Sequence, residues 1–435
     1  MKRLLIASPF LLALLATVAV ASRGQTEEDW PQFRGPRGDG TANTSELPLV
    51  WGETNNLAWK APLAGMGRSS PVVLGDRIWV TTAVGKDVRR TRIGPDEMRT
   101  AEHVTLAVLC LDRSDGRTLW ETDLIEVGQP GPVHWLNSWA TPTPVVEPGH
   151  LYCDFGTYGT VGVDSKTGRI LWRQRLPVDH QVGPGSSPVL WQNLLLLVRD
   201  GRDAQYLAAL DKQTGQTVWK TDRPPIDTPT TDLRKSFSTP LLVNHDGRTQ
   251  MIAAGPHWIV SYDPATGREL WRARHGKGFS FGTCPSFGHG LAFFGTGSFK
   301  AQLWAIRVDG EGDVSETHVA WKNLRQVPIM SSPVLGGDEL YWVSDDGMAC
   351  CADARTGEMH WQERLGGAHL ASPLFAAGRV YFFGQDGKTT VVKAGRRFER
   401  LAENFLDGPL VATPALLKGA ILLRTDSHLY RIGKP

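Results

Sequence analysis

The chain has 435 residues, of which 41% are hydrophobic and 21% are charged, and its formal net charge at pH 7 is +2. A chain of this length and composition can bury a large core, and its balanced charge argues against a nucleic-acid-binding protein. The 47 glycines and 28 prolines indicate many turns, and therefore many short strands.

Residues 1–21 have the features of a signal peptide. Lys2 and Arg3 precede an apolar run that extends to Val20, and Ala21 completes a small-residue cleavage pattern. We expect cleavage after Ala21, with the alternative that the run stays as an uncleaved membrane anchor. The sequence therefore predicts an exported protein, periplasmic or extracellular, with no stable membrane span after signal cleavage.

Five cysteines follow this segment, which is an odd number for an exported chain. They are Cys110, Cys153, Cys284, Cys350 and Cys351. Their spacing matches no metal-ligand pattern, so we predict neither a metal site nor a disulfide framework. None of them directly follows the apolar run, so lipid attachment of the bacterial lipoprotein kind is not expected.

A unit of the form Asp-x-x-Thr-Gly-x-x-x-Trp recurs along the chain at intervals of roughly 40 to 50 residues, which is a period typical of propeller blades. It begins at Asp164, Asp211, Asp263 and Asp353, with a variant at Asp112. The Thr-Gly pair suits a tight turn that the Asp side chain can fix, and the Trp falls on the next strand, where its ring can wedge between sheets. We expect this docking role of Trp59, Trp120, Trp172, Trp219, Trp271, Trp321 and Trp361.

A second marker opens each unit, as a small or polar residue followed by proline and an apolar run. The eight openings are Ser70-Pro71, Thr143-Pro144, Ser187-Pro188, Thr239-Pro240, Cys284-Pro285, Ser332-Pro333, Ser372-Pro373 and Thr413-Pro414. Proline fits the first position of a strand, where its missing N–H costs little. Each unit therefore reads as four antiparallel strands.

The eight openings predict an all-β fold, an eight-bladed β-propeller of four-stranded antiparallel blades over residues 57–435. The last unit has room for only three strands before Pro435, while a spare strand at 57–60 precedes the first opening. We expect that N-terminal strand to complete the last blade and close the ring, which removes exposed sheet edges. Residues 22–56 are predicted to form an irregular strap, and the charged insertion at 86–102 a solvated loop.

The repeat units and proline-led strands resemble the PQQ-type (quinoprotein) β-propeller repeat. That repeat is found in quinoprotein dehydrogenases and in the lipoprotein propeller of the outer-membrane assembly machine. The resemblance covers nearly the whole chain after residue 21, and the segments 29–36 and 183–188 are similar to exported bacterial propellers of this PQQ-binding-like type. It implies PQQ with calcium as cofactor if the chain is a dehydrogenase, but the repeat is a structural motif and leaves function open.

Strand geometry places the Thr-Gly turns on one face of the disk and the blade-to-blade connections on the other, around the mouth of the central channel. The connection face collects non-repeating polar residues, and binding residues usually lie on loops that a rigid scaffold holds. The candidate ligand-binding residues are His134, Asn137, Trp139, Arg202, Asp203, Arg234, Lys235, His257, Asp345, His369, Asp386 and His428. The segment 133–139 is the strongest local candidate, because it sets aromatic faces beside hydrogen-bonding groups, which suits a planar ring or a sugar. Each position also fits an ordinary turn residue, and Trp139 fits packing between blades.

Cys350 and Cys351 are adjacent, like the cysteines that form a disulfide beside the cofactor in methanol-dehydrogenase-like quinoproteins. In this chain Cys351 lies two residues before Asp353, in a slot that holds small residues in the other units. Cysteine packs as a small apolar residue, and neighbouring residues on a strand point to opposite sides. We therefore expect two packed thiols rather than a functional disulfide.

The sequence carries no recognisable catalytic set, such as a Gly-x-Ser-x-Gly elbow or a His-Glu-x-x-His zinc helix. We therefore predict an exported scaffold or binding protein that holds an unknown protein, peptide or glycan on the polar face around its central channel. Enzyme activity stays an open alternative, as a PQQ-dependent alcohol or sugar dehydrogenase. A second alternative is an envelope assembly factor.

Overall fold

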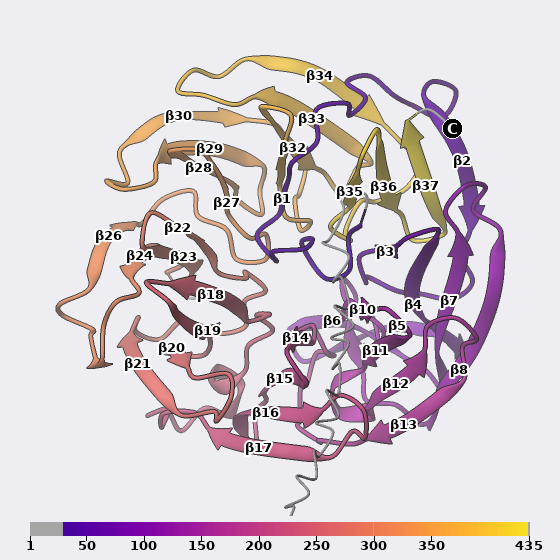
Figure 1. The fold of residues 1–435 in the computed structure, drawn as a ribbon, viewed down its shortest axis with the longest axis horizontal. Helices are drawn as coiled ribbons and strands as arrows, with labels where there is room; N and C mark the ends of the chain where they lie inside the picture. The colour runs from indigo at the N-terminus through magenta and orange to yellow at the C-terminus, as the bar shows by residue number, and fades with distance from the viewer. Residues whose placement is uncertain (1–28, 299, 434–435) are drawn as a thin grey trace, which may run out of the picture.

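The computed structural model describes residues 29–433 except residue 299, so the predicted signal peptide lies outside the described residues. The described part is an all-β fold with eight sheets of four or five strands and one smaller three-stranded sheet. Figure 1 shows the larger sheets set around a common centre, with the first strand of each near the centre and the last near the rim. Among the described residues, no helix is long and apolar enough to cross a membrane.

The first four of these sheets follow one another along the chain, and in each of them four strands pair in sequence order. The first contains β3 (Val72–Leu74), β4 (Arg77–Lys86), β7 (His103–Asp112) and β8 (Thr118–Gly128). The second contains β10 (Val145–Glu147), β11 (His150–Asp154), β12 (Thr160–Asp164) and β13 (Ile170–Gln174). The third contains β14 (Val189–Trp191), β15 (Leu194–Asp200), β16 (Gln205–Asp211) and β17 (Thr217–Asp222). The fourth contains β18 (Leu241–His245), β19 (Arg248–Ala254), β20 (Trp258–Tyr262), β21 (Glu269–Arg274) and the short β25 (Gly312–Asp313).

The next four sheets repeat the pattern, and the last two of them each take in one strand from the N-terminal region. The fifth contains β22 (Ser286–Gly288), β23 (Leu291–Gly295), β24 (Leu303–Arg307) and β26 (Val319–Asn323). The sixth contains β27 (Val334–Gly336), β28 (Glu339–Val343), β29 (Met348–Asp353) and β30 (Met359–Arg364). The seventh contains β31 (Leu374–Ala376), β32 (Arg379–Phe383), β33 (Lys388–Lys393), β34 (Arg400–Phe405) and β1 (Thr41–Ala42). The eighth contains β35 (Ala415–Leu417), β36 (Ala420–Arg424), β37 (His428–Gly433) and β2 (Leu57–Pro62).

The Asp-x-x-Thr-Gly turns are stabilised by the Asp side chain, which accepts hydrogen bonds from backbone N–H groups of the turn. In the turn after β12, Asp164 Oδ1 accepts hydrogen bonds from the N–H groups of Lys166 and Thr167, at 3.0 and 2.8 Å. Gly168 has a φ of +78°, and a Cβ built there would lie 2.7 Å from the ring of Trp120 on the preceding sheet. Glycine is therefore required both by the backbone conformation and by the close approach of the neighbouring sheet.

The repeated tryptophans lie where adjacent sheets meet. The indole N–H of Trp172 on β13 donates to the carbonyl of Lys212 after β16, at 3.0 Å. The indoles of Trp59, Trp219, Trp321 and Trp361 make equivalent bonds to backbone carbonyls of the following unit. Trp271 differs, because its indole donates to Gln250 Oε1 in its own sheet, at 2.8 Å. Most of these rings thus join two sheets by packing and by one hydrogen bond.

The eight opening residues form two runs of hydrogen bonds that pass from sheet to sheet. The N–H of Ser70 donates to Thr143 Oγ1 at 2.9 Å, and the N–H of Thr143 donates to Ser187 Oγ at 2.9 Å. This first run ends with Ser187 to Thr239, and a second run consists of Cys284 to Ser332, Ser332 to Ser372 and Ser372 to Thr413, at 2.9 to 3.0 Å. Within each run, the residue before the proline connects one innermost strand to the next.

We expect Ser332→Ala to lower the free energy of unfolding by about 1–3 kcal/mol, because it leaves the buried N–H of Cys284 without an acceptor. Ser332→Thr is the matched control, since threonine accepts the equivalent bond at Thr143. Urea-unfolding midpoints of the two variants and the wild type measure the difference. An alanine variant as stable as the threonine variant would contradict a stabilising role for this bond.

The segment from Trp30 to Ala42 runs across the ring on the side of the first hairpin turns (Figure 1, indigo). Trp30 pairs with Val73 of the first sheet, and β1 pairs in parallel with β31 of the seventh. Between these contacts the Arg34 side chain is fully buried and donates to the carbonyls of Asp39 and Pro333, each at 2.7 Å. The segment thus contacts the first and seventh sheets and the start of the sixth.

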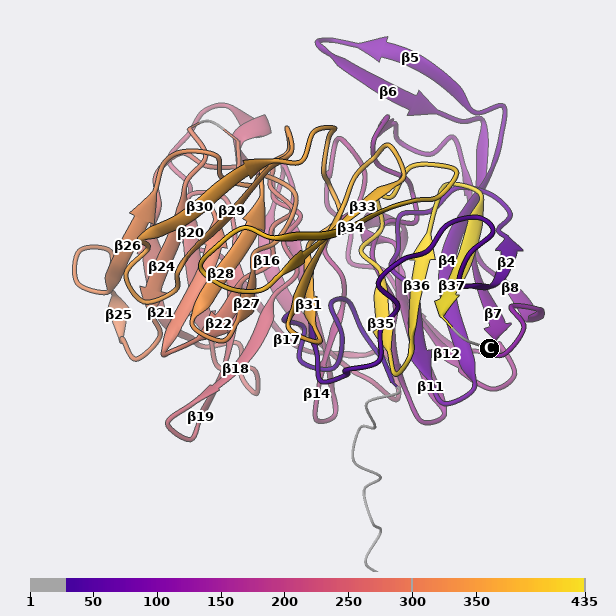
Figure 2. The same cartoon turned by 90° about the horizontal axis from the view of Figure 1, so that it is seen from above.

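The charged insertion at 86–102 is not a loop, so that expectation is wrong. It forms a hairpin of β5 (Arg89–Ile93) and β6 (Asp96–Thr100), and β6 pairs with β9 (Val133–His134). Figure 2 shows this hairpin rising from the first sheet on the side opposite the segment of Trp30 to Ala42. The sequence did not predict these strands, because all five residues of β5 are exposed and show no alternation of apolar and polar residues.

Candidate functional site

A cavity of about 520 Å³ lies at the centre of the ring, on the face that carries the blade-to-blade connections. Its walls include residues from the connections that precede all eight innermost strands, so no single segment builds it. Its aromatic and aliphatic lining includes Phe33, Leu136, Phe237, Phe279, Met330, Leu370 and Val411. Its charged and amide lining includes Arg68, Asp96, Asn137, Gln181, Asp232 and Lys235. We call it the connection-face cavity.

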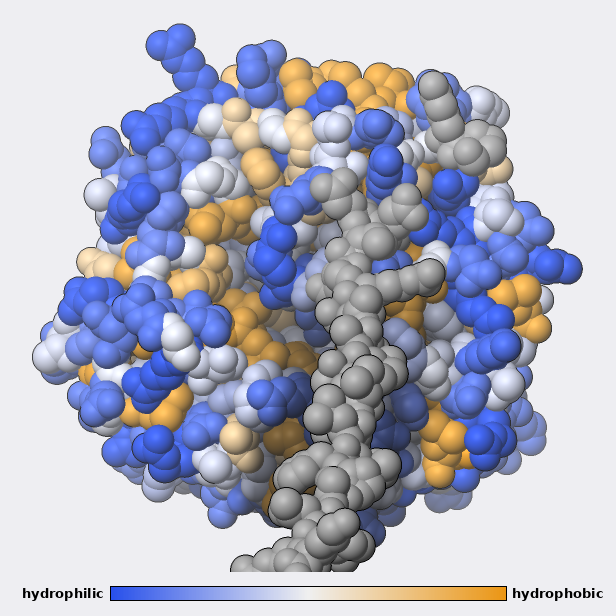
Figure 3. All heavy atoms as spheres, viewed as in Figure 1, coloured by the Kyte–Doolittle hydropathy of each residue, from blue (hydrophilic) through white to orange (hydrophobic). Residues whose placement is uncertain are grey.

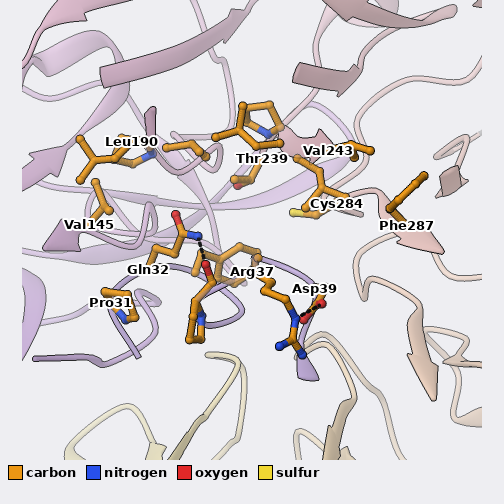
Figure 4. Close-up of a pocket in the computed structure, with 18 of the residues that line it drawn as sticks. Pro31, Gln32, Arg37, Asp39, Val145, Leu190, Thr239, Val243, Cys284 and Phe287 are labelled. Atoms are coloured by element: carbon orange, nitrogen blue, oxygen red, sulfur yellow. Dashed lines mark hydrogen bonds and ion pairs between the residues drawn. The ribbon is translucent and has the colours of Figure 1, made fainter. Parts of the chain in front are cut away.

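A second cavity of about 610 Å³ lies at the other end of the channel. Figure 4 shows Pro31, Gln32, Arg37 and Asp39 along one wall, opposite strand residues such as Leu190. On this face hydrophilic side chains dominate the rim, and apolar ones are seen toward the centre (Figure 3). Phe33 lines both cavities, so the segment of Trp30 to Ala42 supplies the floor of the connection-face cavity.

Three of the twelve predicted site residues line the connection-face cavity: His134, Asn137 and Lys235. Burial lowers the pKa of His134 and of Lys235, and nearby carboxylates partly oppose both shifts. Lys235 donates to Gln181 Oε1, and Asn137 Nδ2 donates to the carbonyls of Val182 and Pro184, at 2.9 and 3.1 Å. Asn137 is therefore held in place by the connection between the second and third sheets.

The predicted residue Trp139 is a packing residue in the structure. Its side chain is buried in the core between the first two sheets, and its indole donates to the carbonyl of Gly131 at 2.8 Å. Arg202 lines a smaller neighbouring cavity of about 390 Å³ and pairs with Asp179 at 2.6 Å. The structure does not bring these two residues to the connection-face cavity.

The other predicted residues lie outside the cavity lining, in turns, in a short 3-10 helix (Arg234) or at the start of β37 (His428). They are Asp203, Arg234, His257, Asp345, His369, Asp386 and His428. Several have local structural partners, as Asp345 accepts from the N–H of Ile329 at 3.0 Å and Arg234 donates to the carbonyl of Thr228 at 2.5 Å. His257 and His369 are buried side chains.

Sequence reasoning did not place the opening residues in the site, although five of them line the cavity. They are Thr143, Ser187, Thr239, Ser372 and Thr413. The signal was present, because the opening residue precedes every innermost strand and therefore lies close to the centre of the ring. The floor residue Phe33 carried no such signal, since it belongs to an irregular segment.

The cysteine pair does not fit a role beside a bound quinone. Cys350 and Cys351 are both buried free thiols, and they belong to two different core clusters on opposite sides of β29. Burial raises the pKa of each thiol to about 12. Neither lines the connection-face cavity. Within residues 29–433 except 299, no group of three or more His, Cys, Asp or Glu residues is placed to hold a metal ion.

The fold and its repeat define the chain as a β-propeller of the PQQ-like repeat type. A family model described as "Outer membrane protein assembly factor BamB" matches residues 106–277 and 255–397, which together cover more than half of the chain. The chain therefore belongs to this PQQ-like family. A comparison with curated protein sequences gives no match.

Solved structures of two kinds share the fold. BamB from Moraxella catarrhalis is 13% identical, with a TM-score of 0.56 over 81% of this chain and 98% of that one. The quinohemoprotein alcohol dehydrogenase ADHIIG from Pseudomonas putida HK5 is 11% identical, with a TM-score of 0.58 over 94% of this chain and 81% of that one. A europium-containing methanol dehydrogenase is 12% identical, with a TM-score of 0.52 over 85% of this chain and 90% of that one. At such low identities these similarities show the fold and leave the function open.

Proposed function

We propose that this chain is an exported binding protein that holds its ligand in the connection-face cavity. The observation that carries the proposal is the cavity itself, a space of about 520 Å³ with apolar walls and a few convergent polar groups. Ligand sites typically occupy about 300–1,000 Å³ and have this kind of lining. Phe33 lies at the floor, so a ligand enters from the connection face.

The proposal includes an eight-bladed ring closed by β2. Two observations support this arrangement. β2 pairs antiparallel with β37, with Lys60 opposite Tyr430, and the hydrogen bonds of the opening residues link the first four sheets in one run and the last four in another. A closed ring would hold the cavity lining in a fixed geometry, because every connection would lie between two anchored sheets.

We expect Val411→Trp to abolish ligand binding, because Val411 is a half-buried lining residue and the larger side chain fills the cavity. The matched control is Val218→Trp on the outer strand β17, where the side chain is 53% exposed. Ligand-observed NMR against a fragment library of aromatic and sugar compounds measures binding for both variants. Fragments that bind the wild type and the Val411→Trp variant equally would place binding elsewhere and overturn the proposal.

An envelope assembly factor is the second candidate, and the family match over residues 106–397 is the observation that favours it. This function predicts that deleting the gene lowers the amount of folded outer-membrane protein in the cell. Normal amounts in a deletion strain would exclude it. Complementation with the Val411→Trp variant would show whether such a role uses the cavity.

A further inference from the structure

We propose that the connection-face cavity recognises an organic anion, binding a carboxylate, phosphate or sulfate group beside Arg68 and holding an apolar body against the opposite wall. This inference rests on the proposed function, and it adds the charge and the chemical class of the ligand. Two independent features of the lining carry it, one of charge and one of hydrogen bonding.

The first feature is an excess of positive charge on one wall. Arg68, Arg99 and Arg424 lie near one another, and the carboxylate of Asp426 is the acidic group that faces them. Asp426 pairs with Arg68, but its side chain is 43% exposed, whereas that of Arg68 is 8% exposed. Of these three guanidinium groups, Arg68 lines the cavity and the other two lie near it, outside the lining. Buried charges are normally paired, so this cluster beside one half-exposed carboxylate is suited to a further anion at Arg68.

Arg424 is fully buried near Arg68, and no described carboxylate forms an ion pair with it. Its Nη1 donates to the carbonyl and the hydroxyl of Ser69, at 3.0 and 2.6 Å, while the buried Nε of each of Arg68 and Arg424 has no hydrogen-bond partner. Burial lowers the pKa of Arg424 to about 9, and the positive charge of Arg68 contributes to the shift. A Cβ at position 67 would collide with the Arg424 guanidinium, so Gly67 leaves the space in which this second cation is housed.

The second feature is a set of hydroxyl groups with unused hydrogens. Thr143, Ser187, Thr239, Ser372 and Thr413 line the cavity, and each oxygen accepts a backbone N–H from the preceding opening residue. The Thr239 hydroxyl also interacts with the Cys284 thiol, whereas the hydroxyl hydrogens of the other four make no hydrogen bond within the described part of the chain. Each of these four oxygens uses one lone pair as an acceptor, and its hydrogen is available to a ligand as a donor. A set of donors that converges on a cavity favours an anionic or strongly accepting group.

The opposite wall is balanced in charge. Asp96 and Asp232 lie close enough to Lys235 to act on its charge, and Asp232 also accepts from Arg202 at 3.3 Å. This wall continues into the apolar residues Phe237 and Met330. The anionic group is therefore directed to the Arg68 side, and the apolar body to this one.

The test compares probes that differ in charge alone. We expect 2-naphthoate to bind the wild-type protein at least tenfold more tightly than 2-naphthamide, which has the same ring system and no charge. Isothermal titration calorimetry at low salt measures both, and 2-naphthyl phosphate in a third titration shows whether the site prefers a phosphate to a carboxylate. Binding of the naphthoate should weaken as potassium chloride is raised, while binding of the amide should not change.

Arg68→Gln should remove most of the preference for the naphthoate and leave binding of the naphthamide unchanged. Arg355→Gln is the control, because Arg355 is an exposed arginine in a Thr-Gly turn on the other face. Equal binding of the two probes to the wild type, abolished by Val411→Trp, would overturn the anion inference and leave the proposed cavity function standing. No binding of any probe to the wild type would overturn the inference together with the proposed function. If Arg68→Gln fails to fold, the wild-type comparison and its salt dependence still decide the inference.

Discussion

Asp154→Asn is expected to lower the free energy of unfolding by about 3–5 kcal/mol, because it removes the charge opposite a fully buried arginine. Asp154 at the end of β11 and Arg199 on β15 are each 1% exposed, and they form a two-pronged ion pair between the second and third sheets at 2.6 and 3.2 Å. Thr160 donates to the same carboxylate at 2.6 Å. The asparagine variant leaves the Arg199 guanidinium buried without a counter-charge, and equilibrium urea unfolding measures the loss.

The control for this prediction is an exposed pair of similar length. Lys393 and Glu399 lie 2.8 Å apart, with side chains 59% and 54% exposed. Glu399→Ala should change the stability by about 0–1 kcal/mol, because water already screens that pair. If Asp154→Asn costs no more than Glu399→Ala, the pair between the sheets does not stabilise the ring.

Acid is expected to destabilise the protein steeply between about pH 6.5 and pH 4, through three buried histidines. Burial lowers the pKa of His180 to about 3 and the pKa values of His275 and His369 to about 4. In the unfolded chain these imidazoles take up protons near pH 6.5, whereas in the folded chain they stay neutral until much lower pH. The unfolded state therefore binds more protons in this window, and folding stability is complete above pH 6.5 and falls as the pH falls.

The expected size of the acid effect is about 1.4 kcal/mol per histidine for each pH unit within this window. Unfolding free energies from urea titrations at pH 7, 6 and 5 measure the slope. Replacing His369 by Gln should reduce it by about a third, and His428→Gln, at a half-buried position on the same face, serves as the control. A pH-independent stability over this range would show that these side chains are accessible to protons in the folded protein.

The repeat was predictable from sequence because its chemistry is local. The turn at Asp164 is determined by residues within four positions of one another, and the same pattern recurs in other units. The pairing of β2 with β37 also followed from counting strands, since the last unit lacked one. The opening residues before each proline were visible as a pattern, although their hydrogen bonds from sheet to sheet were not.

The site was far less predictable, because its lining comes from distant connections whose spacing carries no signal. Arg68 and Met330 line one cavity although more than two hundred residues separate them. His134 and Lys235 were found because they belong to connections that lead into an innermost strand, whereas Asp386 lies in the turn between β32 and β33. Phe33 was missed because nothing local indicates that the segment of Trp30 to Ala42 passes under the channel.

The pairing of β2 with β37 connects the carboxyl end of the described chain to the N-terminal segment that lines the connection-face cavity. β2 follows the segment that carries Phe33, and its pairing strand β37 spans His428–Gly433. Trimming of the carboxyl end by a protease would release β2, and with it one attachment of the cavity floor. Damage at the carboxyl end would thus loosen the floor of the cavity in which we propose that the ligand binds.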